Sequence, residues 1–130
     1  MILIDSSAWV EFERATDSRT DRRLRELLGT DEAIACSEPI MMEVLAGARD
    51  DGHRRRLRRV LKSFDWIETD AQADFEAAAR VYTVCRRAGV TPRGLSDCLI
   101  AAIAIRSGAA VLTADRDFAA IADVMPLTLD

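Results

Sequence analysis

Several residue types are scarce in this chain of 130 residues, and each scarcity removes a class of function. The chain has a single histidine, His53, which excludes a metal-free ribonuclease working with two histidines. A Ser–His or Cys–His nucleophilic pair would have to use the same His53, and no serine or cysteine is near it in the sequence. Because His53 lies in a polar, basic stretch, we expect it at the surface.

Cysteines and long apolar runs are also few. The three cysteines are widely spaced and odd in number, which fits neither a disulfide framework nor a zinc site and favours a reducing cytoplasm. The longest uncharged apolar run, residues 98–105, is too short to cross a bilayer. No signal peptide and no GxxxxGK[ST] phosphate-binding loop are visible. We expect a single domain over residues 1–130.

The charge balance speaks weakly against a nucleic-acid-binding protein, because the formal net charge is -4. The basic residues are nevertheless nearly all arginine, whose planar fork suits phosphate, and Lys62 is the only lysine. Six of them share one segment: Arg54, Arg55, Arg56, Arg58, Arg59 and Lys62. Two interpretations of this segment stay open, a solvated helix face with local salt bridges or a surface that lies along RNA phosphates.

Short apolar stretches alternate with helical patterns along the chain. The predicted strands cover residues 2–4, 33–36, 66–67 and 109–113, with a last edge strand at 126–129. The predicted helices cover residues 7–14, 18–28, 37–48, 53–64, 70–88, 96–108 and 117–122, with Ser7 as the N-cap of the first. This alternation predicts a parallel sheet with helices on both faces, in which ligands bind at the carboxyl ends of the strands.

Acidic residues occur at places where such a fold builds sites. Asp5 directly follows the first strand, and Asp115 and Asp117 follow the strand at 109–113. Asp97 lies in the first turn of an apolar helix, and Glu43 interrupts an otherwise apolar helical stretch. Parallel topology would bring these acids toward one rim of the sheet.

Each acid also has an ordinary structural explanation. Asp5 suits a helix N-cap, Asp97 suits the positive end of a helix dipole, and Asp115 and Asp117 suit turn or cap positions. Glu43 suits an exposed position on a half-buried helix. If four carboxylates do converge, each pair at ~5 Å repels by ~3 kcal/mol at an effective dielectric of ~20, so the cluster must take up protons or bind cations. All-oxygen ligands suit Mg²⁺ or Mn²⁺ and metal-assisted phosphodiester hydrolysis.

Three segments together resemble a known family: LIDSSAWVE, PIMMEVLAG and SDCLIAAIAIRSGAAVLTADRDF. They resemble the PIN domain, and within it the VapC ribonuclease toxins of bacterial toxin–antitoxin pairs. The resemblance covers essentially the whole chain. Its most specific part is the last segment, in which an acid, a small-residue helix, a glycine and a strand precede Thr-x-Asp-x-Asp-Phe.

The resemblance implies an α/β fold, a three-layer α/β/α sandwich with a mostly parallel central sheet, and a Mg²⁺-dependent endoribonuclease with Mn²⁺ as a substitute. It assigns catalytic and metal-binding roles to four acids: Asp5, Glu43, Asp97 and Asp115. It assigns supporting roles to Ser6, Thr113 and Asp117. It also implies a cognate VapB-type antitoxin, an RNA substrate and a homodimer without membrane attachment. Two alternatives stay open: an inactive PIN module that binds RNA or protein, and a metal-dependent nuclease acting on DNA.

Overall fold

The sheet at the centre of the molecule has four parallel strands. The computed structural model describes residues 1–130, and its strands are β1 (Ile2–Ile4), β2 (Ile34–Cys36), β3 (Asp65–Trp66) and β4 (Ala110–Leu112). They are ordered β3-β2-β1-β4, and every pairing between neighbouring strands is parallel. The predicted parallel sheet is therefore confirmed.

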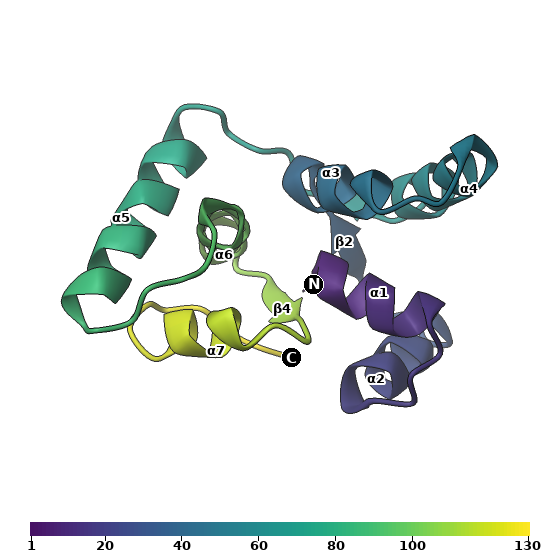
Figure 1. Ribbon diagram of the computed structural model, residues 1–130, viewed down its shortest axis with the longest axis horizontal. Coiled ribbons are helices and arrows are strands. Elements are labelled where there is room, and N and C mark those ends of the chain that lie inside the picture. Colours follow the sequence, from purple (N-terminus) through teal and green to yellow (C-terminus); the bar gives the residue numbers. More distant parts are fainter.

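Seven helices cover the two faces of this sheet. They are α1 (Ser6–Glu13), α2 (Arg19–Leu28), α3 (Glu38–Ala46), α4 (Asp51–Lys62), α5 (Ala73–Arg87), α6 (Leu95–Ser107) and α7 (Arg116–Ala122). Figure 1 shows α1–α4 on one side of the strands and α5–α7 on the other, so the predicted three layers are confirmed. None of the helices is both long and apolar enough to span a bilayer.

The strand order creates one position where the chain changes direction across the sheet. From β1 the chain adds β2 and then β3 on one side, and it later returns to add β4 on the other side of β1. Ligands of open parallel sheets bind outside the carboxyl ends of the strands at such a switch point. In this chain the switch point lies between the ends of β1 and β4, where Asp5 and Thr113 follow the strands.

The core is built around β1, β4 and α6. Leu3, Ile4, Val111 and Leu112 are fully buried. Helix α6 is apolar nearly all round, as its sequence predicts, and it is buried between β4 and α5 along most of its length. This packing fixes the start of α6, and with it Asp97, against the rim of the sheet.

Two predicted local features differ in the structure. The N-cap of α1 is Asp5 and not Ser7, because Asp5 has extended backbone and its side chain accepts the backbone N–H of Ser7. The predicted strand at 126–129 is wrong, since only one bridge forms there, between Leu129 and Val111. The chain touches β4 through the two backbone bonds that flank this bridge and then ends.

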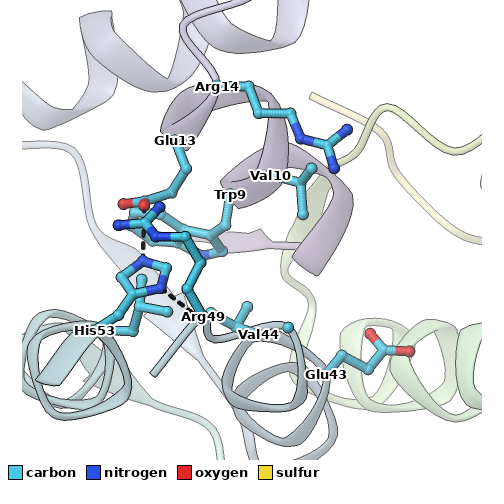
Figure 2. Close-up of a pocket in the computed structure, with 10 residues that line it drawn as sticks. Trp9, Val10, Glu13, Arg14, Glu43, Val44, Arg49 and His53 are labelled. Carbon is cyan, nitrogen blue, oxygen red and sulfur yellow. Dashed lines mark hydrogen bonds and ion pairs between the residues drawn. The ribbon is translucent and has the colours of Figure 1, made fainter. Parts of the chain in front are cut away.

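His53 is buried, so its predicted surface position is also wrong. It lies in the first turn of α4, where its Nδ1 accepts the backbone N–H of Arg49 at 3.1 Å. This bond leaves the proton on Nε2, which lies 3.0 Å from Glu13 Oε2. His53 is buried because it joins the end of α1 to the loop before α4 (Figure 2).

Candidate active site

Asp5 is held at the carboxyl end of β1 by three hydrogen bonds to one of its oxygens. Its Oδ2 accepts from the Ser7 backbone N–H at 3.2 Å, from Ser7 Oγ at 2.5 Å and from Thr113 Oγ1 at 3.0 Å. Its Oδ1 is buried and has no hydrogen-bond partner. Burial raises the pKa of Asp5, and the nearby charge of Glu43 adds to the rise, while these hydrogen bonds oppose it. Asp5 is thus both a helix cap and a buried carboxylate with one unpaired oxygen.

The Ser7 and Thr113 hydroxyls connect the ends of β1 and β4. Besides donating to Asp5, Ser7 Oγ accepts the backbone N–H of Ala114 at 2.9 Å, and Thr113 Oγ1 accepts that of Asp115 at 2.9 Å. The loop after β4 is therefore fixed relative to Asp5. The resemblance assigns a supporting role to Thr113, and in the structure Thr113 bonds directly to Asp5. Ser7 bonds to the same oxygen of Asp5, whereas the sequence indicated Ser7 only as a helix cap.

Glu43 lies on α3, and each of its two carboxylate oxygens accepts a hydrogen bond from a serine hydroxyl. Ser6 Oγ donates to its Oε2 at 2.8 Å, and Ser96 Oγ donates to its Oε1 at 2.8 Å. These bonds join the starts of α1 and α6 to α3, so Glu43 is half-buried between helices from both faces of the sheet. Ser96 was missed by sequence reasoning, although its place directly before Asp97 in a helix start was a usable signal.

Three further carboxylates lie close enough to share one ion. Oxygens of Asp97, Asp115 and Asp117 all lie within 4.8 Å of one another. Burial raises the pKa of Asp97 to about 7, and the charges of Asp115, Asp5, Glu43 and Asp117 add to this rise. Asp97 therefore feels the charge of all four other acids.

Arg93, in the loop before α6, is the one basic side chain bonded to this cluster. It donates from Nη2 to Asp115 Oδ1 at 2.6 Å, and from its backbone N–H and Nε to Asp117 Oδ2 at 2.9 and 3.2 Å. The backbone bond from Arg93 lowers the pKa of Asp117. These contacts of Arg93 were not predicted from the sequence.

The structure brings the predicted acids to one rim but divides them into two groups. Asp97 and Asp115 form the close group together with Asp117, for which the resemblance implies only a supporting role. Asp5 and Glu43 lie beside this group and contribute to the electrostatics of Asp97 without belonging to the set within 4.8 Å. Asp115 is also the N-cap of α7, so its cap and cluster positions coincide.

The residues present fit a divalent cation. The donors are carboxylate oxygens, which Mg²⁺ and Mn²⁺ prefer. Asp5 Oδ1 is buried without a protein partner, and Asp97 shares its surroundings with four other acids. A bound cation would relieve both costs, because it offsets the repulsion that otherwise favours proton uptake.

The basic segment of α4 lies elsewhere. Figure 1 places α4 at the outer edge of the α1–α4 layer, away from α6 and α7, which carry Asp97 and Asp117. Its Leu57 and Leu61 are buried, its arginines are exposed, and Arg54 pairs with Asp51 on the same helix. This segment therefore does not line the acidic site.

A hollow of about 260 Å³ adjoins the site on the side of α1 and α3. Figure 2 shows Glu43 at one end of it and His53 with Glu13 at the other. Its apolar lining comes mainly from Trp9, Val10 and Val44. The acidic rim thus continues into a partly apolar depression.

Comparisons with known proteins agree with this geometry. The family model described as PIN domain matches residues 2–124. The chain is 48% identical over 128 residues to VapC ribonuclease Mb1587 of Mycobacterium bovis and to Ribonuclease VapC11 of Mycobacterium tuberculosis, with 98% of this chain and 96% of each relative covered. The fold also matches VapBC2 from Rickettsia felis bound to a DNA fragment from the promoter, with a TM-score of 0.76, 20% identity and coverage of 100% of this chain and 98% of that chain. VapBC-1 from nontypeable Haemophilus influenzae matches with a TM-score of 0.74, 17% identity and coverage of 100% and 97%. The chain therefore belongs to the PIN-domain family, and within it to the VapC group.

Proposed function

We propose that this protein is the toxin of a type II toxin–antitoxin pair and acts in the cytoplasm as a Mg²⁺-dependent endoribonuclease, with Mn²⁺ as a substitute. The observation that carries the proposal is the cluster of Asp97, Asp115 and Asp117 within 4.8 Å, placed at the switch point of a PIN fold beside buried Asp5. The 48% identity to proteins named as VapC ribonucleases supports RNA as the substrate.

The carboxylates would share the work of holding the cation. Asp97, Asp115 and Asp117 would offer oxygens to one ion, and Asp5, which lies outside this set, would supply its unpaired Oδ1 from the adjoining strand end. A divalent cation held there supplies activation of a water molecule and neutralisation of charge on the phosphodiester.

The chain's own residues position the reacting groups. Ser6 and Ser96 fix both oxygens of Glu43, so this carboxylate stays at the rim in one orientation and is available to accept a proton from water. Ser7 and Thr113 hold Asp5 through Oδ2 alone and leave its Oδ1 without a hydrogen bond. Because four hydroxyls orient two carboxylates before substrate arrives, little reorganisation is needed during the reaction.

The proposed partners are RNA, a cognate VapB-type antitoxin and a second copy of the chain. We propose that a terminal segment of the antitoxin covers the acidic rim and offers an arginine to it. Such an arginine would bond to the carboxylates and compete with the cation for them, which would hold the toxin inactive.

Incubation of the antitoxin-free protein with total cellular RNA tests the proposed function. We expect cleavage with Mg²⁺, loss of cleavage with EDTA, and loss of cleavage in Asp5→Asn and Asp97→Asn. Asp123→Asn serves as the matched control, because Asp123 is exposed at the end of α7 and is not part of the cluster. Cleavage that survives EDTA or both site variants would contradict the proposal.

Two other outcomes correspond to the alternatives. Binding of RNA without turnover, unaffected by the cation, would identify an inactive PIN module. Cleavage of single-stranded DNA in preference to RNA would identify a DNA nuclease. Mapping the cut sites in total RNA then identifies the RNA class.

A further inference from the structure

Arg93 occupies an unusual position, because it is a cation bonded to two of the three carboxylates that would bind a cation. Its guanidinium bridges Asp115 Oδ1 and Asp117 Oδ2, while its side chain is 73% exposed. The side chains of the two acids are much less exposed, 24% for Asp115 and 18% for Asp117. The guanidinium therefore lies on the solvent side of the cluster.

Arg93 bonds to one oxygen of each of two carboxylates in the cluster, Asp115 and Asp117. Oxygens of Asp97, Asp115 and Asp117 lie within 4.8 Å of one another, so these carboxylates repel one another when they are ionised. Arg93 offsets part of this repulsion from outside. Asp5 Oδ1, buried and without a partner, is not reached by any basic group. Arg93 thus offsets the charge of Asp115 and Asp117 and leaves Asp5 without a basic partner.

The backbone at Arg93 is fixed, whereas its side chain is free to leave. The backbone N–H of Arg93 bonds to Asp117, and the preceding Pro92 is buried. The guanidinium has no partner besides the two carboxylates. Loss of those two bonds would therefore release the guanidinium without moving the loop.

We propose that the Arg93 guanidinium competes with the divalent cation for Asp115 and Asp117. Once the cation displaces it, the guanidinium binds a phosphate of the RNA. The proposal rests on the proposed function. A guanidinium displaced from these carboxylates stays tethered within one side-chain length of the cluster. Its planar fork matches two phosphate oxygens as well as it matches carboxylates.

Mn²⁺ binding to the RNA-free protein tests the competition, measured by titration calorimetry with no substrate present. We expect Arg93→Gln to bind Mn²⁺ about tenfold more tightly than the unaltered protein, which corresponds to ~1.4 kcal/mol. Arg93→Lys should lie between the two, since one ammonium keeps the charge but cannot bridge both acids. Arg87→Gln is the charge-matched control: Arg87 is exposed on α5 without an ion pair, and we expect little change.

Cleavage of total RNA at saturating Mn²⁺ tests whether the displaced Arg93 binds the RNA. We expect Arg93→Gln to cleave at least tenfold more slowly even though it binds the cation more tightly. This opposition is the signature, because a merely structural defect would weaken both properties. Unchanged or weaker Mn²⁺ binding in Arg93→Gln, an equal gain in Arg87→Gln, or undiminished cleavage would overturn the proposal.

The two proposals fail in different ways. If the unaltered protein binds Mn²⁺ but does not cut RNA, the proposed function fails, and the binding titration still decides whether Arg93 competes with the cation. If the unaltered protein cuts RNA in a Mn²⁺-dependent way while Arg93→Gln behaves identically, only the role of Arg93 is rejected.

Discussion

Thr113 and Asp5 are 108 positions apart in the chain, yet Thr113 Oγ1 donates a 3.0 Å hydrogen bond to Asp5 Oδ2. The bond joins the residue that follows β4 to the residue that follows β1, across the switch point of the sheet. The bond gives the buried Asp5 carboxylate one of its hydrogen-bond donors. The same hydroxyl accepts the backbone N–H of Asp115 and so fixes the loop that carries Asp115.

Replacement of Thr113 by valine keeps the shape and removes the hydroxyl. We expect the free energy of unfolding to fall by about 1–2 kcal/mol, because Asp5 loses a charge-assisted bond and the Asp115 N–H loses its acceptor. RNA cleavage should also slow down under conditions in which the variant is still fully folded. Urea unfolding and cleavage rates check this. Thr83→Val is the control, since the Thr83 hydroxyl bonds only within its own exposed helix.

Glu43 should depend on its two serine partners. We expect Ser6→Ala and Ser96→Ala each to slow RNA cleavage several-fold, because each frees one oxygen of Glu43 to rotate. In a Glu43→Gln background the same serine changes should have much smaller effects, since the oriented carboxylate is already absent. Cleavage rates of the single and combined variants measure this. Equal effects in both backgrounds would contradict the role assigned to the serines.

The raised pKa of Asp97 makes stability of the cation-free protein dependent on pH. Burial and neighbouring acids raise this pKa from 3.8 to about 7, so the folded state binds a proton that the unfolded state releases earlier. Stability from this group is complete below pH ~4 and is lost as the pH rises to ~7, by about 2 kcal/mol after solvent screening. Urea unfolding in EDTA across this range checks the direction.

Added Mg²⁺ and Asp97→Asn provide the controls for that measurement. Mg²⁺ should restore stability at neutral pH, because it binds only the folded cluster. Asp97→Asn should flatten the dependence on pH between ~4 and ~7, since the titrating group is gone. If the stability of cation-free Asp97→Asn falls between pH ~4 and ~7 as much as that of the unaltered protein does, the assignment to Asp97 is contradicted.

Asp74 and Arg106 form a bidentate pair that ties α5 to α6. Arg106 donates to both oxygens of Asp74 at 2.7 and 2.8 Å, and Asp74 is buried. We expect Asp74→Ala to lower the free energy of unfolding by about 2–4 kcal/mol, measured in urea. The double variant Asp74→Ala with Arg106→Met should recover part of this loss, because no unpaired charge then remains. A further loss in the double variant would show that Arg106 stabilises α6 independently.

The sequence predicted the fold well because its helices and strands have clear apolar periods and end at glycines and caps. The parallel sheet, both helical layers and the buried α6 follow from these local patterns. The strand expected at 126–129 fails, because pairing with β4 depends on a distant partner and not on local apolar character. His53 fails for the same reason, since Glu13 and the Arg49 N–H that bury it lie outside its own segment.

The site was predictable to the level of residue types, and its inner arrangement was not. Topology places Asp5 and Asp115 at neighbouring strand ends, and the structural explanation of each as a helix cap turns out to hold together with its place in the site. The hydroxyl pair around Glu43 and the bridge from Arg93 depend on side-chain directions across separate helices. The catalytic and metal-binding roles of the acids and the single-domain organisation stay predictions.

The pairing of β1 with β4 has a consequence during synthesis of the protein. The first strand, Glu43 and Asp97 leave the ribosome before residues 110–117, so the nascent chain carries one half of the acidic site without the edge strand that supplies the other half. Any product of premature termination before β4 lacks two of the three clustered carboxylates. A copy that ends before β4 therefore cannot assemble the three-carboxylate cluster, because Asp115 and Asp117 are absent from it.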